Sequence, residues 1–152
     1  MKIDTSTVPI ETGTNYPVQF HSAVEGRSRR RVGTAAGLTN FGVNLTTLNP
    51  GSQSALRHWH SAQDEFVYVV QGELVLVTEN KEQTLEAGEM AGFAAGIANG
   101  HHLINRSDHP ATYLEIGDCT TPDRVDYPDQ DLQCVPTDKG SRVFLHRDGR
   151  TY

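Results

Sequence analysis

Two histidines one residue apart, followed closely by two carboxylates, stand out in the segment RHWHSAQDEF at residues 57–66. Side chains alternate between the faces of a β-strand, so His58 and His60 would point the same way, with Cα atoms about 6.5 Å apart. Two imidazoles at that spacing can converge on one metal ion. Glu65 could join them if the preceding residues form a bend, whereas Asp64 would lie within that bend and be held less firmly.

A third histidine is available much later in the chain, in the segment NGHHLINRS at residues 99–107. On a strand, only one of the neighbours His101 and His102 can point inward. His101 would share its face with Leu103 and an amide, while His102 would share its face with Ile104. The residues alone leave this choice open.

The elements that position these side chains are predicted to be short β-strands, because helical periodicity is nearly absent from the chain. Residues 41–50 are rich in β-branched and aromatic residues. Residues 65–80 are predicted to form a hairpin around Gln71-Gly72, and residues 101–117 a second hairpin. Short strands separated by Gly, Pro, Asn and Asp indicate an all-β antiparallel sandwich or barrel.

The segments on either side of this strand-rich region differ from it in composition. Residues 25–40 are basic and then rich in Gly and Ala, and we expect an exposed loop there. Its arginines could hold a phosphate or a carboxylate, but a solvated loop or a subunit contact is the favoured interpretation. The cluster consists of Arg27, Arg29, Arg30 and Arg31. From Asp118 onward the chain is rich in Pro and Asp and has too few apolar residues for its own core.

Composition limits the class of protein. The 152 residues favour a single domain, and the net charge of −6 argues against nucleic acid or an anionic membrane as a partner. No apolar run approaches the length of a membrane span, and the first ten residues lack the apolar stretch of a secretory signal. Cys119 and Cys134 are too far apart for a redox pair, and we expect free thiols in the cytoplasm, although a mutual disulfide is the alternative.

The histidine segments together resemble the two motifs of the cupin superfamily. The first, G-x5-H-x-H-x3,4-E-x6-G, is reproduced by His58, His60, Glu65 and Gly72, with Gly51 one residue further away than the pattern requires. This motif is highly specific, and the second motif is only moderately so.

The second motif, G-x5-P-x-G-x2-H-x3-N, is matched more loosely. Gly88 fits its start, and His101 with Asn105 fits its end, which favours His101 over His102. Its proline position holds Ala94. Small bacterial cupins with similar motifs are sometimes labelled sugar-phosphate isomerases.

This resemblance implies a double-stranded β-helix, or jelly-roll, barrel over residues 40–117. Residues 1–39 would then form an N-terminal arm and loop, and residues 118–152 a C-terminal extension that packs on the barrel or on a partner subunit. The resemblance also implies a homodimer, since cupins commonly bury sheet edges and faces by pairing.

The ligand set that the resemblance implies for one divalent metal is His58, His60, Glu65 and His101. Three imidazoles and a carboxylate suit Fe, Mn, Ni, Co or Zn better than Ca or Mg, which prefer oxygen. Four protein ligands leave coordination positions open for a substrate or water.

Three functions are compatible with such a site. The first is a metal-dependent isomerase, epimerase or lyase that acts on a small oxygenated metabolite by Lewis-acid catalysis. The second is an Fe(II) dioxygenase, and the third is a binding protein without catalysis. Glu115 and Tyr113, which share a strand face, are the candidates for general acid and base. Phe93 is the candidate pocket aromatic.

Overall fold

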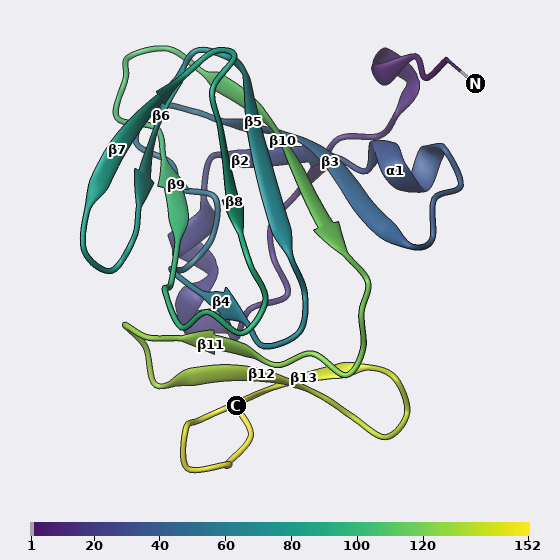
Figure 1. Cartoon of the computed structure of the whole chain (residues 1–152), viewed down its shortest axis with the longest axis vertical. Coiled ribbons are helices and arrows are strands. Elements are labelled where there is room, and N and C mark those ends of the chain that lie inside the picture. The colour runs from purple at the N-terminus through teal and green to yellow at the C-terminus, as the bar shows by residue number, and fades with distance from the viewer. Residues whose placement is uncertain (1) are drawn as a thin grey trace.

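The computed structural model describes residues 2–152, and most of its regular structure is β-strand. The helices are short: η1 (Thr5–Thr7), η2 (Val18–Val24) and α1 (Val32–Ala35). Within residues 2–152, none of them combines the length and apolar character that crossing a bilayer requires. The strands form three antiparallel sheets (Figure 1).

The largest sheet has six strands in the order β1-β2-β3-β10-β5-β8. In chain order these are β1 (Glu11–Thr12), β2 (Arg27–Arg30), β3 (Phe41–Leu48), β5 (Glu65–Gln71), β8 (Met90–Phe93) and β10 (Ala111–Asp118). A three-stranded sheet has the order β7-β6-β9. It consists of β6 (Glu73–Val77), β7 (Glu82–Glu86) and β9 (His102–Ile104).

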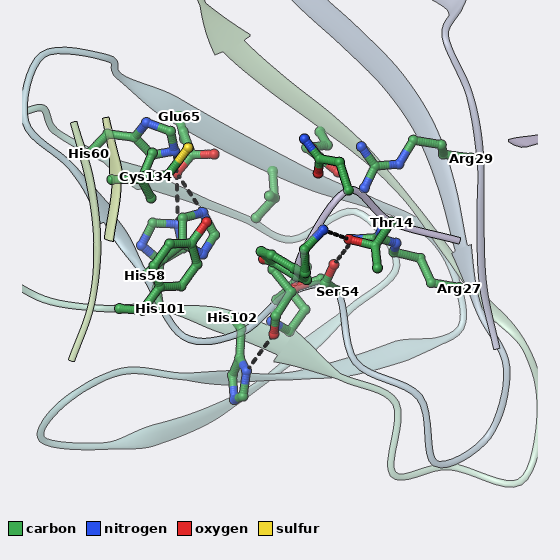
Figure 2. Close-up of a pocket in the computed structure, with 18 of the residues that line it drawn as sticks. Thr14, Arg27, Arg29, Ser54, His58, His60, Glu65, His101, His102 and Cys134 are labelled. Carbon is green, nitrogen blue, oxygen red and sulfur yellow. Dashed lines mark hydrogen bonds and ion pairs between the residues drawn. The ribbon is translucent and has the colours of Figure 1, made fainter. Parts of the chain in front are cut away.

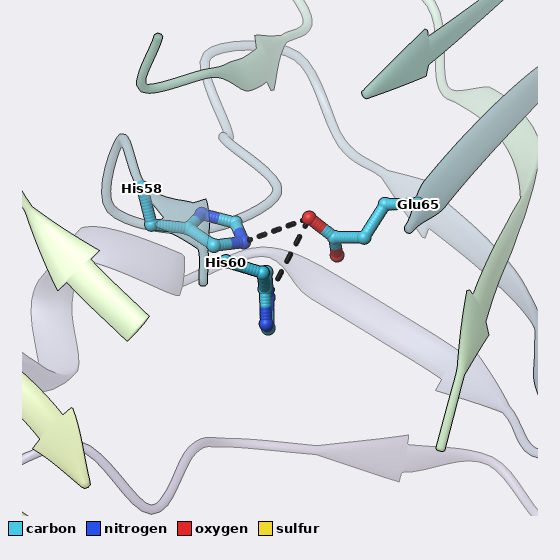
Figure 3. Close-up of side chains that lie close together, drawn as sticks. All are labelled: His58, His60 and Glu65. Atoms are coloured by element: carbon cyan, nitrogen blue, oxygen red, sulfur yellow. Dashed lines mark ion pairs between the residues drawn. The ribbon is translucent and has the colours of Figure 1, made fainter. Parts of the chain in front are cut away.

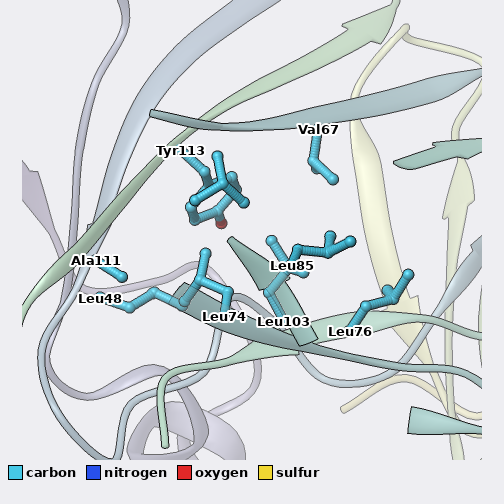
Figure 4. Packing of buried hydrophobic residues seen from close by; sticks show 9 residues of the cluster. Leu48, Val67, Leu74, Leu76, Leu85, Leu103, Ala111 and Tyr113 are labelled. Atoms are coloured by element: carbon cyan, nitrogen blue, oxygen red, sulfur yellow. The ribbon is translucent and has the colours of Figure 1, made fainter. Parts of the chain in front are cut away.

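The main hydrophobic core lies between these two sheets (Figure 4). The six-stranded sheet contributes Leu48, Val67, Val69, Ala111 and Tyr113. The three-stranded sheet contributes Leu74, Leu76, Leu85 and Leu103. Each fully buried leucine stabilises the fold by about 1.5–3 kcal/mol relative to an exposed one, so this layer holds the two sheets together.

The hairpin predicted for residues 65–80 is not formed. β5 hydrogen-bonds to β8 and β10, whereas β6 hydrogen-bonds to β7 and β9, so the turn at Gly72 takes the chain from one sheet to the other. Gly72 has a φ of +79°, and a Cβ there would lie 3.0 Å from the Ala111 Cβ, so the turn requires glycine. The hairpin predicted for residues 101–117 is wrong for the same reason, because β9 and β10 belong to different sheets.

The exposed loop predicted for residues 25–40 is also a misinterpretation. Its residues 27–30 form β2, which pairs with β3 on one side and with β1 on the other. Arg27 is 7% exposed. A basic strand is accommodated here because its alternate side chains face a polar cavity instead of the hydrophobic core.

The C-terminal residues form a third sheet, in the order β13-β12-β11-β4, which lies across one end of the other two sheets (Figure 1). Its strands are β4 (Trp59–His60), β11 (Val125–Tyr127), β12 (Leu132–Pro136) and β13 (Arg142–Leu145). A second hydrophobic cluster attaches it: Leu56, Val125, Tyr127, Leu132 and Cys134. Because β4 carries His60, this sheet is directly connected to the histidine segment.

Candidate metal centre

The histidine pair and the third histidine are brought together by a backbone bridge. The His58 N–H donates to the His101 carbonyl at 3.1 Å, and the His101 N–H donates to the His58 carbonyl at 2.8 Å. Residues opposite each other in an antiparallel pair project to the same face, so the imidazoles of His58 and His101 lie beside one another. Their ring centroids are 5.0 Å apart.

All three imidazoles converge on one carboxylate oxygen. The Glu65 Oε2 lies 3.1 Å from the Nε2 of His101, 3.5 Å from that of His60 and 3.6 Å from that of His58. Figure 3 shows Glu65 at the start of β5 pointing toward the two neighbouring histidines. Three Nε2 atoms and a carboxylate oxygen around one point are the donor set that a transition metal binds.

The buried Glu65 Oε2 supports this fit. It makes no hydrogen bond of good geometry to any residue between 2 and 152, although almost all buried polar atoms in proteins are hydrogen-bonded. A bound cation would satisfy this oxygen.

Contacts at Nδ1 orient the rings of His58 and His60, and stacking orients the ring of His101, whose Nδ1 makes no hydrogen bond within residues 2–152. The His58 Nδ1 lies 2.9 Å from the Leu56 carbonyl, and the His60 Nδ1 lies 2.7 Å from the Asp123 Oδ2. Phe93 stacks on His101 with ring centroids 3.5 Å apart and planes 2° apart. Such outer contacts fix the orientation and tautomer of metal-binding histidines.

Asp123 was not identified from the sequence, and it comes from the C-terminal extension. Its side chain is fully buried, accepts a hydrogen bond from the Ala62 N–H at 2.9 Å and forms an ion pair with Arg142 at 3.1 Å. The surrounding sequence TTPDRVDYPD has no spacing that relates Asp123 to His60. Only the three-dimensional structure places the two side chains together.

The electrostatics of the cluster act in opposite directions on its histidines. Burial opposes ionisation of Glu65, but the close imidazoles of His101 and His58 outweigh it and hold the pKa of Glu65 well below its usual range. Burial lowers the pKa of His101, which keeps this imidazole neutral, whereas for His58 the contact with Glu65 outweighs burial and raises the pKa. An ionised carboxylate beside a neutral imidazole is ready to bind a cation.

The structure distinguishes between the alternatives that the sequence left open. Asp64 is exposed and accepts a hydrogen bond from the Ala95 N–H at 2.8 Å, away from the histidines. The His102 Nδ1 lies 3.0 Å from the Ala55 carbonyl. Glu65 and His101 are therefore the residues that the fold brings into the cluster.

The fold has counterparts among known proteins. The Cupin domain family matches residues 44–117. A sugar phosphate isomerase of the cupin superfamily from Silicibacter pomeroyi is 41% identical, the match covers 100% of this chain and 96% of that one, and the TM-score is 0.95. The chain belongs to the cupin superfamily. The predicted all-β jelly-roll fold is thus confirmed for this cupin.

Two further cupin-like structures extend the comparison. A candidate sugar phosphate isomerase from Acidithiobacillus ferrooxidans is 26% identical over 90% of this chain and 94% of that one, with a TM-score of 0.74. The polyketide cyclase RemF from Streptomyces resistomycificus is 17% identical over 81% of this chain and 82% of that one, with a TM-score of 0.66. The last likeness concerns the fold alone. No curated protein matches the chain.

The histidine–glutamate cluster of this cupin lies at one end of a cavity of about 670 Å³ (Figure 2). That volume is in the range of small-molecule sites. Besides the four cluster residues, charged and polar side chains line it: Glu11, Thr14, Tyr16, Arg27, Arg29, Arg31, Ser54, Tyr113, Glu115, Tyr127 and Arg142. The cavity therefore suits a polar ligand that can reach the cluster.

Glu115 and Tyr113, the candidates for acid–base chemistry, both line this cavity from β10. The Glu115 carboxylate accepts long hydrogen bonds from the Asn44 amide at 3.5 Å and the Thr46 hydroxyl at 3.4 Å. Tyr113 is 1% exposed. Phe93 lines the cavity through its contact with His101, as the sequence indicated.

Proposed function

We propose that this cupin is a metal-dependent enzyme that isomerises, epimerises or cleaves a small polyhydroxylated metabolite. The observation that carries the proposal is the convergence of three imidazole Nε2 atoms on the buried Glu65 Oε2, at the end of a cavity that also holds Glu115. A carboxylate near such a cluster supplies the proton acceptor that a Lewis acid alone lacks.

His58, His60, Glu65 and His101 would hold one Fe, Mn, Ni, Co or Zn ion. When bound, the ion acts as a Lewis acid that stabilises negative charge developing on a substrate oxygen. The protein contributes the fixed ring orientations and a cavity wall that positions the substrate.

Glu115 is the proposed base. On β10 it lies between Tyr113 and Gly117, and Gly117 pairs with Glu65. A substrate that reaches the cluster along β10 would therefore pass the Glu115 carboxylate. This carboxylate can take a proton from the carbon next to the substrate's carbonyl group and return it to the carbonyl carbon. Burial raises the pKa of Tyr113 far above its usual value, so its hydroxyl stays protonated and acts as a hydrogen-bond donor.

The relatives support the substrate class. The protein from Silicibacter pomeroyi is a sugar phosphate isomerase by name, and it aligns with the whole of this chain. A sugar phosphate combines vicinal oxygens suitable for a Lewis acid with a carbon-bound proton suitable for Glu115.

Elemental analysis of protein purified without an affinity tag tests the metal. We expect about one transition-metal ion per chain in the wild type and almost none in His58→Ala. His109→Ala is the matched control, because His109 is an exposed histidine outside the cluster. A protein that takes up none of the five dications, or a His58→Ala variant that retains as much metal as the control, would contradict the proposal.

The reaction is tested with aldose and ketose phosphates in D2O, using NMR to follow product formation and deuterium at the carbon next to the carbonyl. Exchange or interconversion that depends on the metal supports an isomerase. Oxygen consumption linked to bound iron would instead indicate the dioxygenase, and binding without turnover would indicate a non-catalytic cupin.

A further inference from the structure

The end of the cavity opposite the metal cluster is basic. Figure 2 shows Arg27 and Arg29 on the side of the cavity away from the Glu65 carboxylate. Strand register explains their direction: Arg29 pairs with Thr46, which pairs with the inward-facing Tyr113 on β10. Residues directly opposite one another share a sheet face, so Arg29 and, two residues away, Arg27 face the cavity.

The charges of these two arginines are not neutralised by carboxylates. The Arg27 guanidinium donates to the Ser54 carbonyl at 2.5 Å and the Gly13 carbonyl at 2.9 Å, and these neutral acceptors hold it in place. Arg29 makes no side-chain hydrogen bond or ion pair within residues 2–152. Arg31, in contrast, pairs with Glu11 at 2.7 Å.

A hydroxyl without a partner lies at the same end. The buried Tyr113 hydroxyl makes no hydrogen bond of good geometry to residues 2–152. Arg27, Arg29 and Tyr113 line the same cavity. A buried donor without an acceptor, in a cavity lined by two cations that no carboxylate neutralises, indicates an anionic ligand.

We propose that Arg27, Arg29 and the Tyr113 hydroxyl form a subsite for the phosphate of a sugar-phosphate or polyol-phosphate substrate. The inference rests on the proposed function, which it makes more specific by assigning the substrate's charged end. A phosphate monoester offers a dianion with three terminal oxygens, which matches two cations and one hydroxyl donor better than a carboxylate does.

The subsite also fixes the direction of the substrate. Along β10, Tyr113 lies at the arginine end, Gly117 pairs with Glu65 at the metal end, and Glu115 lies between them. A substrate with its phosphate at the arginines would thus place its carbon chain beside Glu115 and its far oxygens at the cluster. Arg27 and Arg29 are binding residues in this arrangement, and Glu115 is the catalytic residue.

The test is calorimetric titration of the full chain with inorganic phosphate at constant ionic strength. Arg29→Gln should weaken phosphate binding about tenfold to a hundredfold, because it removes a charge-assisted hydrogen bond, and Tyr113→Phe about threefold to tenfold. Arg30→Gln is the matched control: it removes the same charge one residue away, from a side chain that donates to the Val8 carbonyl. It should change the affinity less than twofold.

Three outcomes would overturn the subsite: no phosphate binding at millimolar concentration, equal effects of Arg29→Gln and Arg30→Gln, or binding of acetate as tight as that of phosphate. Metal content measured on the same samples separates this inference from the proposed function. Arg29→Gln should retain the metal content of the wild type. If the wild type binds no metal while phosphate binding still depends on Arg29, the proposed function fails and the anion subsite stands.

Discussion

The metal end and the arginine end of the cavity are assembled from the chain in different ways. Three of the four cluster residues come from one short segment, residues 58–65, and a single backbone bridge adds His101. The arginine end depends on the register of β2 against β3 and of β3 against β10. The first end is therefore visible as local spacing in the sequence, and the second is defined only by strand pairing.

The two ends also differ in how their polar groups are satisfied. At the metal end, His58 and His60 have an outer partner for Nδ1, and Asp123 is itself held by Arg142. At the arginine end, Arg29 and the Tyr113 hydroxyl have no such partner within residues 2–152. Unpartnered atoms therefore remain at both ends within residues 2–152, but two of the three histidine rings are already held by hydrogen bonds, whereas the Arg29 guanidinium is held by none.

The largest expected effect is the loss of kcat in Glu115→Gln, because Glu115 lies between the two ends of the cavity. Loss of the proton acceptor should lower kcat about 10²- to 10⁴-fold, whereas metal content and phosphate affinity should change little. Steady-state kinetics, elemental analysis and calorimetry on one preparation measure all three. A variant that retains wild-type kcat would remove Glu115 from the mechanism and leave both ends intact.

Asp123→Asn should affect only the metal end. Replacing the carboxylate that orients His60 should weaken metal binding about tenfold to a hundredfold, as outer partners of metal-binding histidines typically do. Competition against a chelator of known affinity measures the change, and phosphate titration serves as the internal control. Equal losses of metal and phosphate affinity would show that Asp123 supports the whole fold and not one end of the cavity.

Binding of metal at one end and of phosphate at the other should each stabilise the folded chain. Metal or phosphate supplied at about 100 times its Kd should each stabilise the folded chain by about 2.7 kcal/mol, or raise Tm by about 5–10 °C for a chain of this size. The two shifts should add, since the ligands occupy separate ends. Thermal unfolding with each ligand alone and with both tests this, and a combined shift no larger than either single shift would indicate one shared site.

The smallest expected effect is a difference in alkylation rate between the two cysteines. Burial raises the pKa of Cys134, which lowers the thiolate fraction at any given pH and slows its alkylation. Cys119 is exposed, and both thiols are free. Mass spectrometry after brief treatment with iodoacetamide should find Cys119 modified at least about ten times faster than Cys134. Comparable rates would mean that the C-terminal sheet opens readily at the metal end.

The sequence predicted those parts of the fold and site that depend on local spacing. His58, His60 and Glu65 follow strand alternation and a bend, both of which are encoded within a few residues. The same alternation identified β5 and β6 as strands but assigned them to one hairpin, because a strand's pattern of faces does not specify its hydrogen-bonding partner.

The residues that sequence reasoning missed depend on long-range packing. An anion-binding role was considered for Arg27 and Arg29, but a solvated loop or a subunit contact was favoured because charged residues are normally exposed, and nothing local indicated a polar cavity on the inner face of β2. Asp123 lies in a Pro- and Asp-rich segment that resembles a surface loop. Its burial results from contact with His60 and Arg142, which are distant in sequence.

Asp123, Arg27 and Arg29 all lie outside residues 44–117, the part of the chain that the cupin family pattern describes. A comparison limited to the shared barrel would therefore overlook the carboxylate that orients His60 and the two guanidinium groups at the far end of the cavity.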